Sequence, residues 1–319
     1  MEETCRSSAF FDDLTIGPVW SHDNLAVHPL IAAAAGKRAY LTMDEALATK
    51  SFRVSEISKS GGVPELKVLN DLSQPVLLLD GEALVGAKQN RVLNLSIMVP
   101  AQTEMNIPVS CVEAGRWRHV SDRFASSDHA QFARGRARKV AQVSYAMRER
   151  GARMSDQSDV WSEIAAKSVR MSASSPTAAM SAIYESSREP LEDFVAEMPQ
   201  HQGQVGAVFA IHGRIAGIDV FDYADTFVKA APKLKRSYAL DALESAPPSA
   251  NNEAHSDSVR AFLDDIEGAN VSRFKALGLG DDLRLKGRDF TGAALEVSGL
   301  IVHLVSFRDG LHEIGQVST

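Results

Sequence analysis

The stretch Ala207–Phe221, AVFAIHGRIAGIDVF, decides the fold class of this 319-residue chain. It is an apolar run, a two-residue turn that ends in glycine (His212-Gly213) and a second apolar run, which is the pattern of a tight β-hairpin. The same plan recurs in PVLLLDGEALVG, 75–86, and in ALEVSGLIVHLVSF, 294–307. Hairpins in both halves of the chain, with helical segments between and after them, predict an antiparallel α+β fold rather than regular βαβ alternation.

The first part of the chain, 12–120, is expected to be β-rich. Its β-prone runs are 25–30, 52–57, 66–69, 76–79, 91–99 and 105–112, and turn residues such as Asp80-Gly81 separate them. One short helix over 43–49 interrupts this pattern. Thr42 can cap it, because Glu45 stands three residues later in the capping-box position.

The second part, 126–200, is expected to be helical, because apolar residues recur there at spacings of three and four. Gly151 and the serine-rich stretch 171–176 mark breaks. After them we expect helices over 160–169, 177–187 and 191–197, the last begun by Pro190 in the first-turn position that proline tolerates.

The third part, 205–307, is expected to be mixed. It contains predicted strands over 205–211 and 215–221, helices over 225–243 and 259–277, and a strand meander over 283–307. SAPPSANNEAHSDS, 245–258, has no apolar periodicity and is predicted to be a mobile loop. We expect one domain over 12–307, with tails at 1–11 and 308–319.

Composition and charge exclude several classes of protein. With 45% hydrophobic and 24% charged residues the chain has the composition of a folded globular protein, and its net charge of −7 makes nucleic acid an unlikely partner. The two cysteines, Cys5 and Cys111, favour a reducing compartment over a disulfide framework. Without a signal peptide or a long apolar run, we expect a cytoplasmic protein with no membrane partner. Composition fixes neither a cofactor nor an oligomeric state.

A dense group of polar residues lies in Leu77–Asn94, LLLDGEALVGAKQNRVLN. Four of them follow the expected strand end at Gly86, namely Lys88, Gln89, Asn90 and Arg91. A turn there would present their donors and acceptors together, which suits a phosphate or a sugar phosphate. Glu82 adds a carboxylate that could act as a general acid or base. In the alternative interpretation these are solvated loop ends, and Glu82 forms a surface ion pair with one of the cations.

A second polar group ends the stretch Ile107–His119, IPVSCVEAGRWRH. Trp117 could stack on a flat ring and Arg116 could meet an anion, while Glu113 is a second candidate acid or base. Cys111 lies inside a predicted strand. We expect it to be a small core residue rather than a nucleophile activated by His119.

No spacing typical of a metal site occurs, so no metal is expected. Oxygen ligands from Asp219, Asp222 and Asp225 would suit Mg²⁺ or Ca²⁺, but the favoured interpretation is that Asp222 or Asp225 caps the following helix. The segment 116–153 holds ten Arg or Lys against three acidic residues. It could attract an anionic ligand, or it could be a solvated helix face or pair with acidic residues elsewhere.

Three stretches together resemble a known family: Pro75–Asn94, Ile97–Trp117 with its IPVSCVEAGRW string, and Val205–Phe227 followed by KLKRSYALDAL. The chain is similar over most of 12–307 to a bacterial domain family named for its association with ADP-ribosylglycohydrolases and rhodanese-phosphatase proteins. The resemblance implies one conserved unit and a context of NAD and ADP-ribose metabolism. It implies no catalytic residues, because the family's name describes associated proteins.

Two functions are therefore predicted as alternatives. In the first, the protein binds or processes a small phosphorylated ligand of the NAD or ADP-ribose type, with Lys88, Gln89 and Arg91 as its phosphate and ribose contacts. In the second, it is a non-catalytic interaction module whose basic helix docks an acidic protein partner. The first requires Glu82, Lys88, Arg91 and the segment 113–117 to line one concave site.

Overall fold

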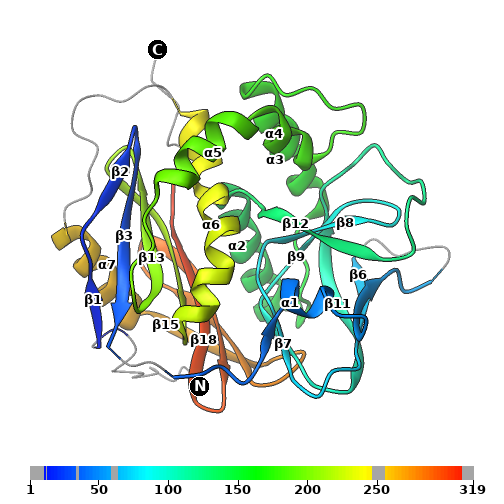
Figure 1. Cartoon of the computed structure of the whole chain (residues 1–319), viewed down its shortest axis with the longest axis horizontal. Helices are drawn as coiled ribbons and strands as arrows, with labels where there is room; N and C mark the ends of the chain where they lie inside the picture. The colour runs from blue at the N-terminus through cyan, green and yellow to red at the C-terminus, as the bar shows by residue number, and fades with distance from the viewer. Residues whose placement is uncertain (1–10, 12, 34–35, 59–63, 246–255, 311–319) are drawn as a thin grey trace. The chain divides into compact units, whose positions relative to one another are not determined.

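The computed structural model describes residues 11, 13–33, 36–58, 64–245 and 256–310. In these ranges the chain forms seven helices and eighteen strands, and its contacts divide it into two compact units. Unit 1 comprises 1–38, 190–276 and 280–319, and unit 2 comprises 39–189 and 277–279. Apart from one short parallel pair the strands pair antiparallel, so the predicted α+β class is confirmed (Figure 1).

Unit 1 is built on a nine-stranded sheet. Its strands in spatial order are β1 (Leu14–Ile16), β3 (Leu25–Ala32), β13 (Gln204–Ile211), β14 (Arg214–Phe221), β18 (Leu300–Arg308), β17 (Phe290–Val297), β16 (Asp281–Lys286) and β15 (Asn270–Lys275), and β2 (Trp20–His22) pairs with β3. The N-terminal strands therefore pair with strands from much later in the chain. The predicted strands at 205–211 and 215–221 and the meander at 283–307 are confirmed.

Two of the three predicted hairpins lie in this sheet. β13 and β14 are joined by His212 and Gly213 at φ 51° and 71°, and β17 and β18 by Ser298 and Gly299 at φ 53° and 80°. Positive φ at both central residues is what a two-residue type I′ hairpin turn requires. Glycine at the second position meets that requirement without strain.

Helices cover both faces of this sheet. α6 (Ala224–Glu244) runs along β13 (Figure 1) and confirms the predicted helix at 225–243; its Tyr238 ring stacks on Phe209 with 3.9 Å between centroids. α7 (Ser256–Glu267) packs Phe262 into a core that contains Val208. Because Val208 and Phe209 are adjacent in one strand, they point to opposite faces, and so the two helices lie on opposite sides.

The helix predicted over 259–277 is too long. α7 ends at Glu267, and Asn270–Lys275 is a strand that pairs with β16, because the backbone gains a full ladder of cross-strand partners there. Of the predicted loop at 245–258, residues 246–255 lie outside the described ranges, and 256–258 form the first turn of α7. Of the predicted N-terminal tail, Phe11 is buried in the core of unit 1. The other tail residues at 1–10 and 311–319 lie outside the described ranges.

Unit 2 contains two smaller sheets. The six-stranded sheet has the order β12 (Phe124–Ala130), β8 (Glu82–Gly86), β9 (Arg91–Leu93), β11 (Thr103–Cys111), β6 (Glu65–Asn70) and β5 (Phe52–Ser55). The three-stranded sheet has the order β10 (Ile97–Val99), β7 (Val76–Leu78) and β4 (Leu41–Thr42), with β4 and β7 parallel. The predicted strands at 52–57, 66–69, 76–79 and 105–112 are confirmed. The single strand predicted over 91–99 is wrong, because this run forms β9 and β10, which belong to different sheets. α1 (Met43–Leu47) is also as predicted, and the Glu45 carboxylate accepts from the Thr42 N–H at 2.9 Å.

The third predicted hairpin, at 75–86, is wrong. Asp80-Gly81 does form a turn, in which the Glu82 N–H donates to the Leu79 carbonyl at 3.1 Å. However, β7 pairs with β10 and β4, whereas β8 pairs with β9 and β12. At this turn the chain passes from one sheet to the other, and Asp80 forms ion pairs there with the buried Arg136 and Lys139.

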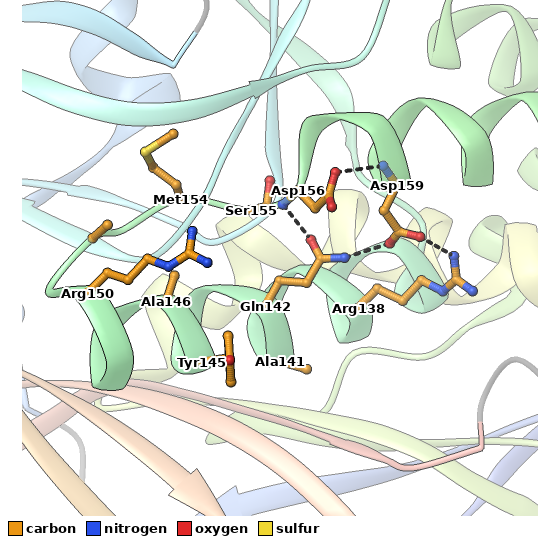
Figure 2. A pocket seen from close by; sticks show the side chains of 11 residues that line it. Arg138, Ala141, Gln142, Tyr145, Ala146, Arg150, Met154, Ser155, Asp156 and Asp159 are labelled. Atoms are coloured by element: carbon orange, nitrogen blue, oxygen red, sulfur yellow. Dashed lines mark hydrogen bonds and ion pairs between the residues drawn. The ribbon is translucent and has the colours of Figure 1, made fainter.

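The helices of the middle region are α2 (Ala133–Arg150), α3 (Gln157–Arg170), α4 (Met180–Ser186) and α5 (Arg188–Glu197). The predicted helical region begins too early, because Phe124–Ala130 is a strand that pairs with β8. Gly151, at φ 63°, ends α2 as expected. Between α2 and the segment that leads to α3 lies an open pocket with a volume of about 920 Å³ (Figure 2).

Candidate functional site

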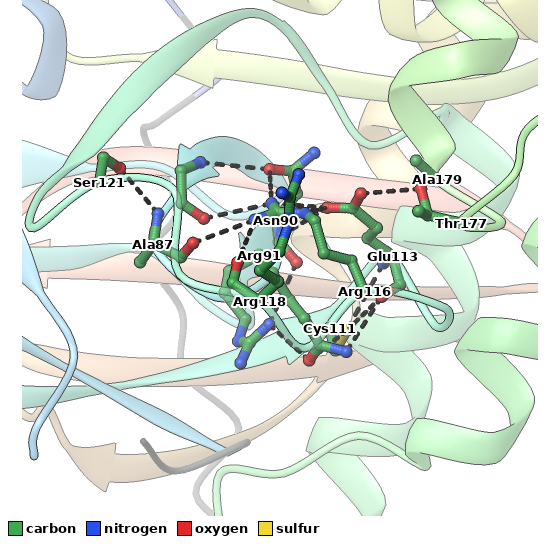
Figure 3. Close-up of polar contacts among 12 residues, drawn as sticks. Ala87, Asn90, Arg91, Cys111, Glu113, Arg116, Arg118, Ser121, Thr177 and Ala179 are labelled. Carbon is green, nitrogen blue, oxygen red and sulfur yellow. Dashed lines mark hydrogen bonds and ion pairs between the residues drawn. The ribbon is translucent and has the colours of Figure 1, made fainter. Parts of the chain in front are cut away.

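The polar run after Gly86 forms the turn of a hairpin between β8 and β9. Arg91 pairs with Leu84 across that hairpin and with Cys111 on its other side. The end of β11 therefore lies beside the turn. Figure 3 shows side chains of both segments converging, with Asn90 and Arg91 from the turn and Glu113 and Arg116 from the segment after β11.

Arg116 closes this turn. Its guanidinium donates to Glu113 Oε2 at 2.8 Å, to the Ala87 carbonyl at 3.0 Å and to Asn90 Oδ1 at 3.0 Å. Glu113 also accepts from the Thr177 hydroxyl at 2.8 Å and from the Asn90 N–H at 3.2 Å. Burial alone would raise the pKa of Glu113, but these hydrogen bonds outweigh it and hold the pKa below its ordinary value. Both charged groups are therefore engaged in holding the turn.

Gln89 links the turn to the cysteine. Its Nε2 donates to the Glu113 carbonyl at 3.1 Å, and its Oε1 accepts from Arg91 Nη1 at 3.0 Å and from Cys111 Sγ at 3.1 Å. Burial raises the pKa of the Cys111 thiol, with the Glu113 backbone and Arg91 opposing. His119 is exposed and lies 3.1 Å from Asp122. A protonated, buried thiol beside an amide fits the predicted core cysteine and gives no support to a Cys-His nucleophile.

Arg91 differs from its neighbours because some of its hydrogen-bond donors have no partner. It is fully buried, and only Nη1 donates, to Gln89 and weakly to the Asn90 carbonyl at 3.4 Å. Nε and Nη2 have no hydrogen-bond partner in the described part of the chain. Burial lowers the pKa of Arg91, and the negative charge of Glu56 opposes that change. Such a group is rare in a folded protein, because an unpaired buried donor is costly.

Glu56 carries the matching opposite charge. It follows β5, and both of its carboxylate oxygens are buried without a hydrogen-bond partner among the described residues. The negative charge of Glu56 raises the pKa of Arg91, yet neither carboxylate oxygen forms a hydrogen bond with the guanidinium. Sequence reasoning missed Glu56, because a single glutamate after a strand has no local signal. Only the pairing of β5, β6, β11 and β9 brings it near Arg91.

Trp117 provides an aromatic surface at the same place. Its side chain is 49% exposed, and its ring centroid lies 5.1 Å from Lys88 Nζ and 6.0 Å from Arg91 Cζ. Trp117 itself lies outside any helix or strand. The predicted stacking residue is thus next to the two predicted cations, which is the geometry of cation–π contacts.

Glu82 is not part of this cluster. It begins β8, and its Oε2 accepts from the Leu79 N–H at 2.9 Å, at the Asp80-Gly81 turn. Seven of the eight predicted site residues come together: Lys88, Gln89, Asn90, Arg91, Glu113, Arg116 and Trp117. The general acid or base predicted at Glu82 lies at the opposite end of its strand.

Several cations of the basic segment 116–153 pair with acidic residues. Lys139 is fully buried, forms an ion pair with Asp80 at 3.1 Å, and donates to the Leu93 carbonyl at 2.7 Å and to Gln131 at 3.0 Å. Its pKa is lowered by burial. Arg136 Nε lies 3.3 Å from Asp80, and Arg138 pairs with Asp159 at 3.1 Å.

The three aspartates of 219–225 are separated by their contacts. Asp219 is fully buried, accepts from the Tyr238 hydroxyl at 3.0 Å and lies 3.2 Å from His303 Nε2. Asp225 pairs with Arg38 at 2.6 Å. Tyr223 occupies the N-cap position of α6 without a capping bond from its side chain, so the prediction that Asp222 or Asp225 is the cap is wrong. Within the described ranges, no group of three or more His, Cys, Asp or Glu could hold a metal ion.

Comparison with known proteins identifies a family. The family model described as the ARG and Rhodanese-Phosphatase-superfamily-associated Protein domain, ARPP-1, matches residues 13–307. Neither the curated proteins nor the solved structures contain a match to this chain. Among the helices described, none combines the length and apolar character needed to cross a membrane. Since the match spans nearly the whole chain and both units, the chain belongs to the ARG and Rhodanese-Phosphatase-superfamily-associated Protein domain family.

Proposed function

We propose that this protein binds a small phosphorylated ligand of the NAD or ADP-ribose type at Arg91 and Glu56, beside the Trp117 ring. The observation that carries the proposal is that Nε and Nη2 of the buried Arg91 and both carboxylate oxygens of Glu56 are shielded from solvent without a hydrogen-bond partner in the described part of the chain. Their neighbours Glu113 and Arg116 have full sets of partners and serve the turn instead.

The chemistry of a sugar phosphate complements this pair. Nε and Nη2 of Arg91 are donors that can bind two phosphate oxygens, the geometry in which guanidinium groups recognise phosphate. The Glu56 oxygens can accept from ribose hydroxyls, and the half-exposed Trp117 ring offers a surface for a flat base. Each part of an ADP-ribose-like ligand therefore has a partner of the right kind.

The family's name supports the same class of ligand. It records association with ADP-ribosylglycohydrolase and rhodanese-phosphatase proteins, which are names of associated proteins rather than of an activity of this chain. Binding has more support than processing. Glu82 lies away from Arg91, and Glu113 is ionised and held by three hydrogen bonds, so neither is placed as a general acid.

The alternative, an interaction module that docks an acidic partner through the basic helix, has less support. Arg136 and Lys139 of α2 are buried and bound to Asp80. Cations that form ion pairs inside the fold are not available to bind an acidic partner, so this helix offers fewer charges for docking.

Ligand-induced thermal stabilisation tests the proposal. A ligand that binds only the folded state raises the melting temperature by mass action, and a concentration 100 times its Kd contributes about 2.7 kcal/mol. We expect ADP-ribose, NAD or AMP to raise the melting temperature of the wild type, and Glu56→Gln to reduce the effect. Lys275→Gln, which removes an exposed cation of unit 1, is the control and should behave as the wild type. No stabilisation by any of these ligands at millimolar concentration would rule the proposal out.

A further inference from the structure

The pocket beside α2 shares no lining residue with the Arg91 cluster. It is lined by one side of α2 and by the segment 152–159, and none of its lining residues belongs to the predicted site. Its volume of about 920 Å³ lies within the range of small-molecule sites in proteins. Figure 2 shows Asp156, Asp159, Gln142 and Arg138 at the end next to α3, and Arg150 with Met154 and Ala146 at the other end.

The polar side chains at the end of the pocket next to α3 hold one another in place. Gln142 donates to Asp159 at 2.6 Å and accepts from the Asp156 N–H at 2.9 Å. Asp156 caps α3 by accepting from two backbone N–H groups, and Arg138 pairs with Asp159 at 3.1 Å. The cation at this end is therefore neutralised, and the carboxylates remain as hydrogen-bond acceptors.

The wall formed by 152–159 is fixed to the sheet of unit 2. Ser155 Oγ lies 2.6 Å from Ser110 Oγ, and Asn94 Nδ2 donates to the Arg153 carbonyl at 3.2 Å. Gln157 bonds both the N–H and the carbonyl of Cys111, each at 2.8 Å. A wall held at several points is pre-organised, which lowers the entropic cost of binding a ligand.

The other end offers one cation and two apolar surfaces. Tyr145 is 57% exposed and Met154 is 50% exposed, which is unusual for side chains of this size. Arg150 ends α2, is exposed, and has no hydrogen-bond or ion-pair partner among the described residues. Figure 2 shows its side chain lying between α2 and the segment that carries Met154.

We infer that this pocket is a second binding site, for a ligand with a flat ring that carries one anionic group, of the nucleoside monophosphate kind. The ring lies against Tyr145 and Met154, since aromatic faces and thioether sulfur both favour contact with a ring. The anion pairs with Arg150, five residues further along the helix and about 7.5 Å along its axis. Donor groups of the ligand point toward Asp156 and Asp159.

The test is calorimetric titration with AMP, adenosine and ribose 5-phosphate. AMP should bind more tightly than either of the other two, because only AMP has both the ring and the anion. Arg150→Gln should weaken AMP binding by about 10- to 100-fold, the effect of losing a charge-assisted hydrogen bond. Tyr145→Leu should also weaken it. Arg148→Gln removes an exposed cation from the same turn of α2 that does not line the pocket, and should bind as the wild type.

Arg91→Met separates this inference from the proposed function. Loss of AMP binding in Arg150→Gln but not in Arg91→Met supports the pocket. If AMP binding is lost only in Arg91→Met, the pocket is not the AMP site, and the proposed function still stands. If the wild type does not bind AMP at all, the inference about the pocket is also wrong. A local readout comes from the methyl resonance of Met154, assigned with Met154→Leu, which should shift on AMP addition. An unshifted Met154 signal at saturating AMP would also overturn the inference.

Discussion

Two buried arginines of unit 2 show how a structural charge differs from a candidate binding charge. Arg136 shares Asp80 with Lys139, and Lys139 has three hydrogen-bond or ion-pair partners. Arg91 is as deeply buried, but two of its three nitrogens lack hydrogen-bond partners in the ranges described. A charge that the fold itself needs is normally fully paired. We therefore assign Asp80, Arg136 and Lys139 to stability and Arg91 to binding.

Removing the Asp80 carboxylate, which pairs with both Arg136 and Lys139, tests whether these three residues stabilise the fold. Asp80→Asn leaves Arg136 and Lys139 buried without their counter-ion, and we expect unfolding in urea to show a loss of about 3–5 kcal/mol. The control is Glu104→Gln, which breaks the solvent-exposed pair with Lys67 and should cost at most ~1 kcal/mol. Equal losses in the two variants would contradict a structural role for the Asp80 cluster.

At the residue scale the sequence predicted which side chains gather but not what they do. The KQNR run and the EAGRW string come together as predicted, because β9 and β11 are neighbours. Their roles depend on distant partners. Glu113 accepts a hydrogen bond from Thr177, which is 64 residues away in the sequence. The carboxylate whose negative charge acts on Arg91 belongs to Glu56, which is also distant in the sequence. No local pattern contains either relation.

At the element scale, three similar sequences gave two kinds of turn. His212-Gly213 and Ser298-Gly299 close hairpins, whereas Asp80-Gly81 joins two sheets. The local sequence is alike in all three, so the turn residues alone do not decide whether the flanking strands pair with each other or with other strands. The same limit explains residues 126–130 and 270–275, which the sequence predicts to be helical. They form strands instead, because they pair with β8 and β16.

The His212 turn predicts a pH dependence of stability. Asn24 Nδ2 donates to His212 Nε2 at 3.1 Å, which requires an unprotonated Nε2, and burial lowers the pKa of His212 below 6.5. The unfolded chain then binds more protons than the folded chain as the pH falls through that value, so protonation destabilises the fold. His212→Asn keeps a residue that suits positive φ but does not titrate.

Urea unfolding of both proteins at about pH 7.5 and about pH 5.5, on either side of the ordinary histidine pKa, measures this effect. The wild type should lose more stability than His212→Asn between the two values. An equal loss would show that other groups account for the acid sensitivity.

At the scale of the whole molecule, the chain order interleaves the two units. The chain leaves unit 1 after residue 38, returns at 190, and contributes 277–279 to unit 2 before finishing in unit 1. α5 is continuous across the boundary at 189 and 190. The family model also spans both units. That the two form one cooperative domain stays a prediction.

Tryptophan fluorescence can test it, because the reporters are divided between the units. Trp20 lies in unit 1, and Trp117 and Trp161 lie in unit 2. We expect urea unfolding curves of Trp20→Phe and of the double variant Trp117→Phe/Trp161→Phe to have the same midpoint, as a single two-state transition requires. Two clearly separated midpoints, not explained by the stability of the variants themselves, would show that the units unfold independently.

The proposed function depends most directly on Arg91, and one variant measured in two ways tests it. Arg91→Met replaces a cation whose pKa is lowered by burial with an apolar side chain of similar length. We expect calorimetry to show ADP-ribose affinity weakened by roughly 1.5–3 kcal/mol, while the free energy of unfolding in urea stays within ~1 kcal/mol of the wild type or rises. A loss of several kcal/mol in stability with unchanged ADP-ribose affinity would show that Arg91 serves the fold and would contradict the binding site.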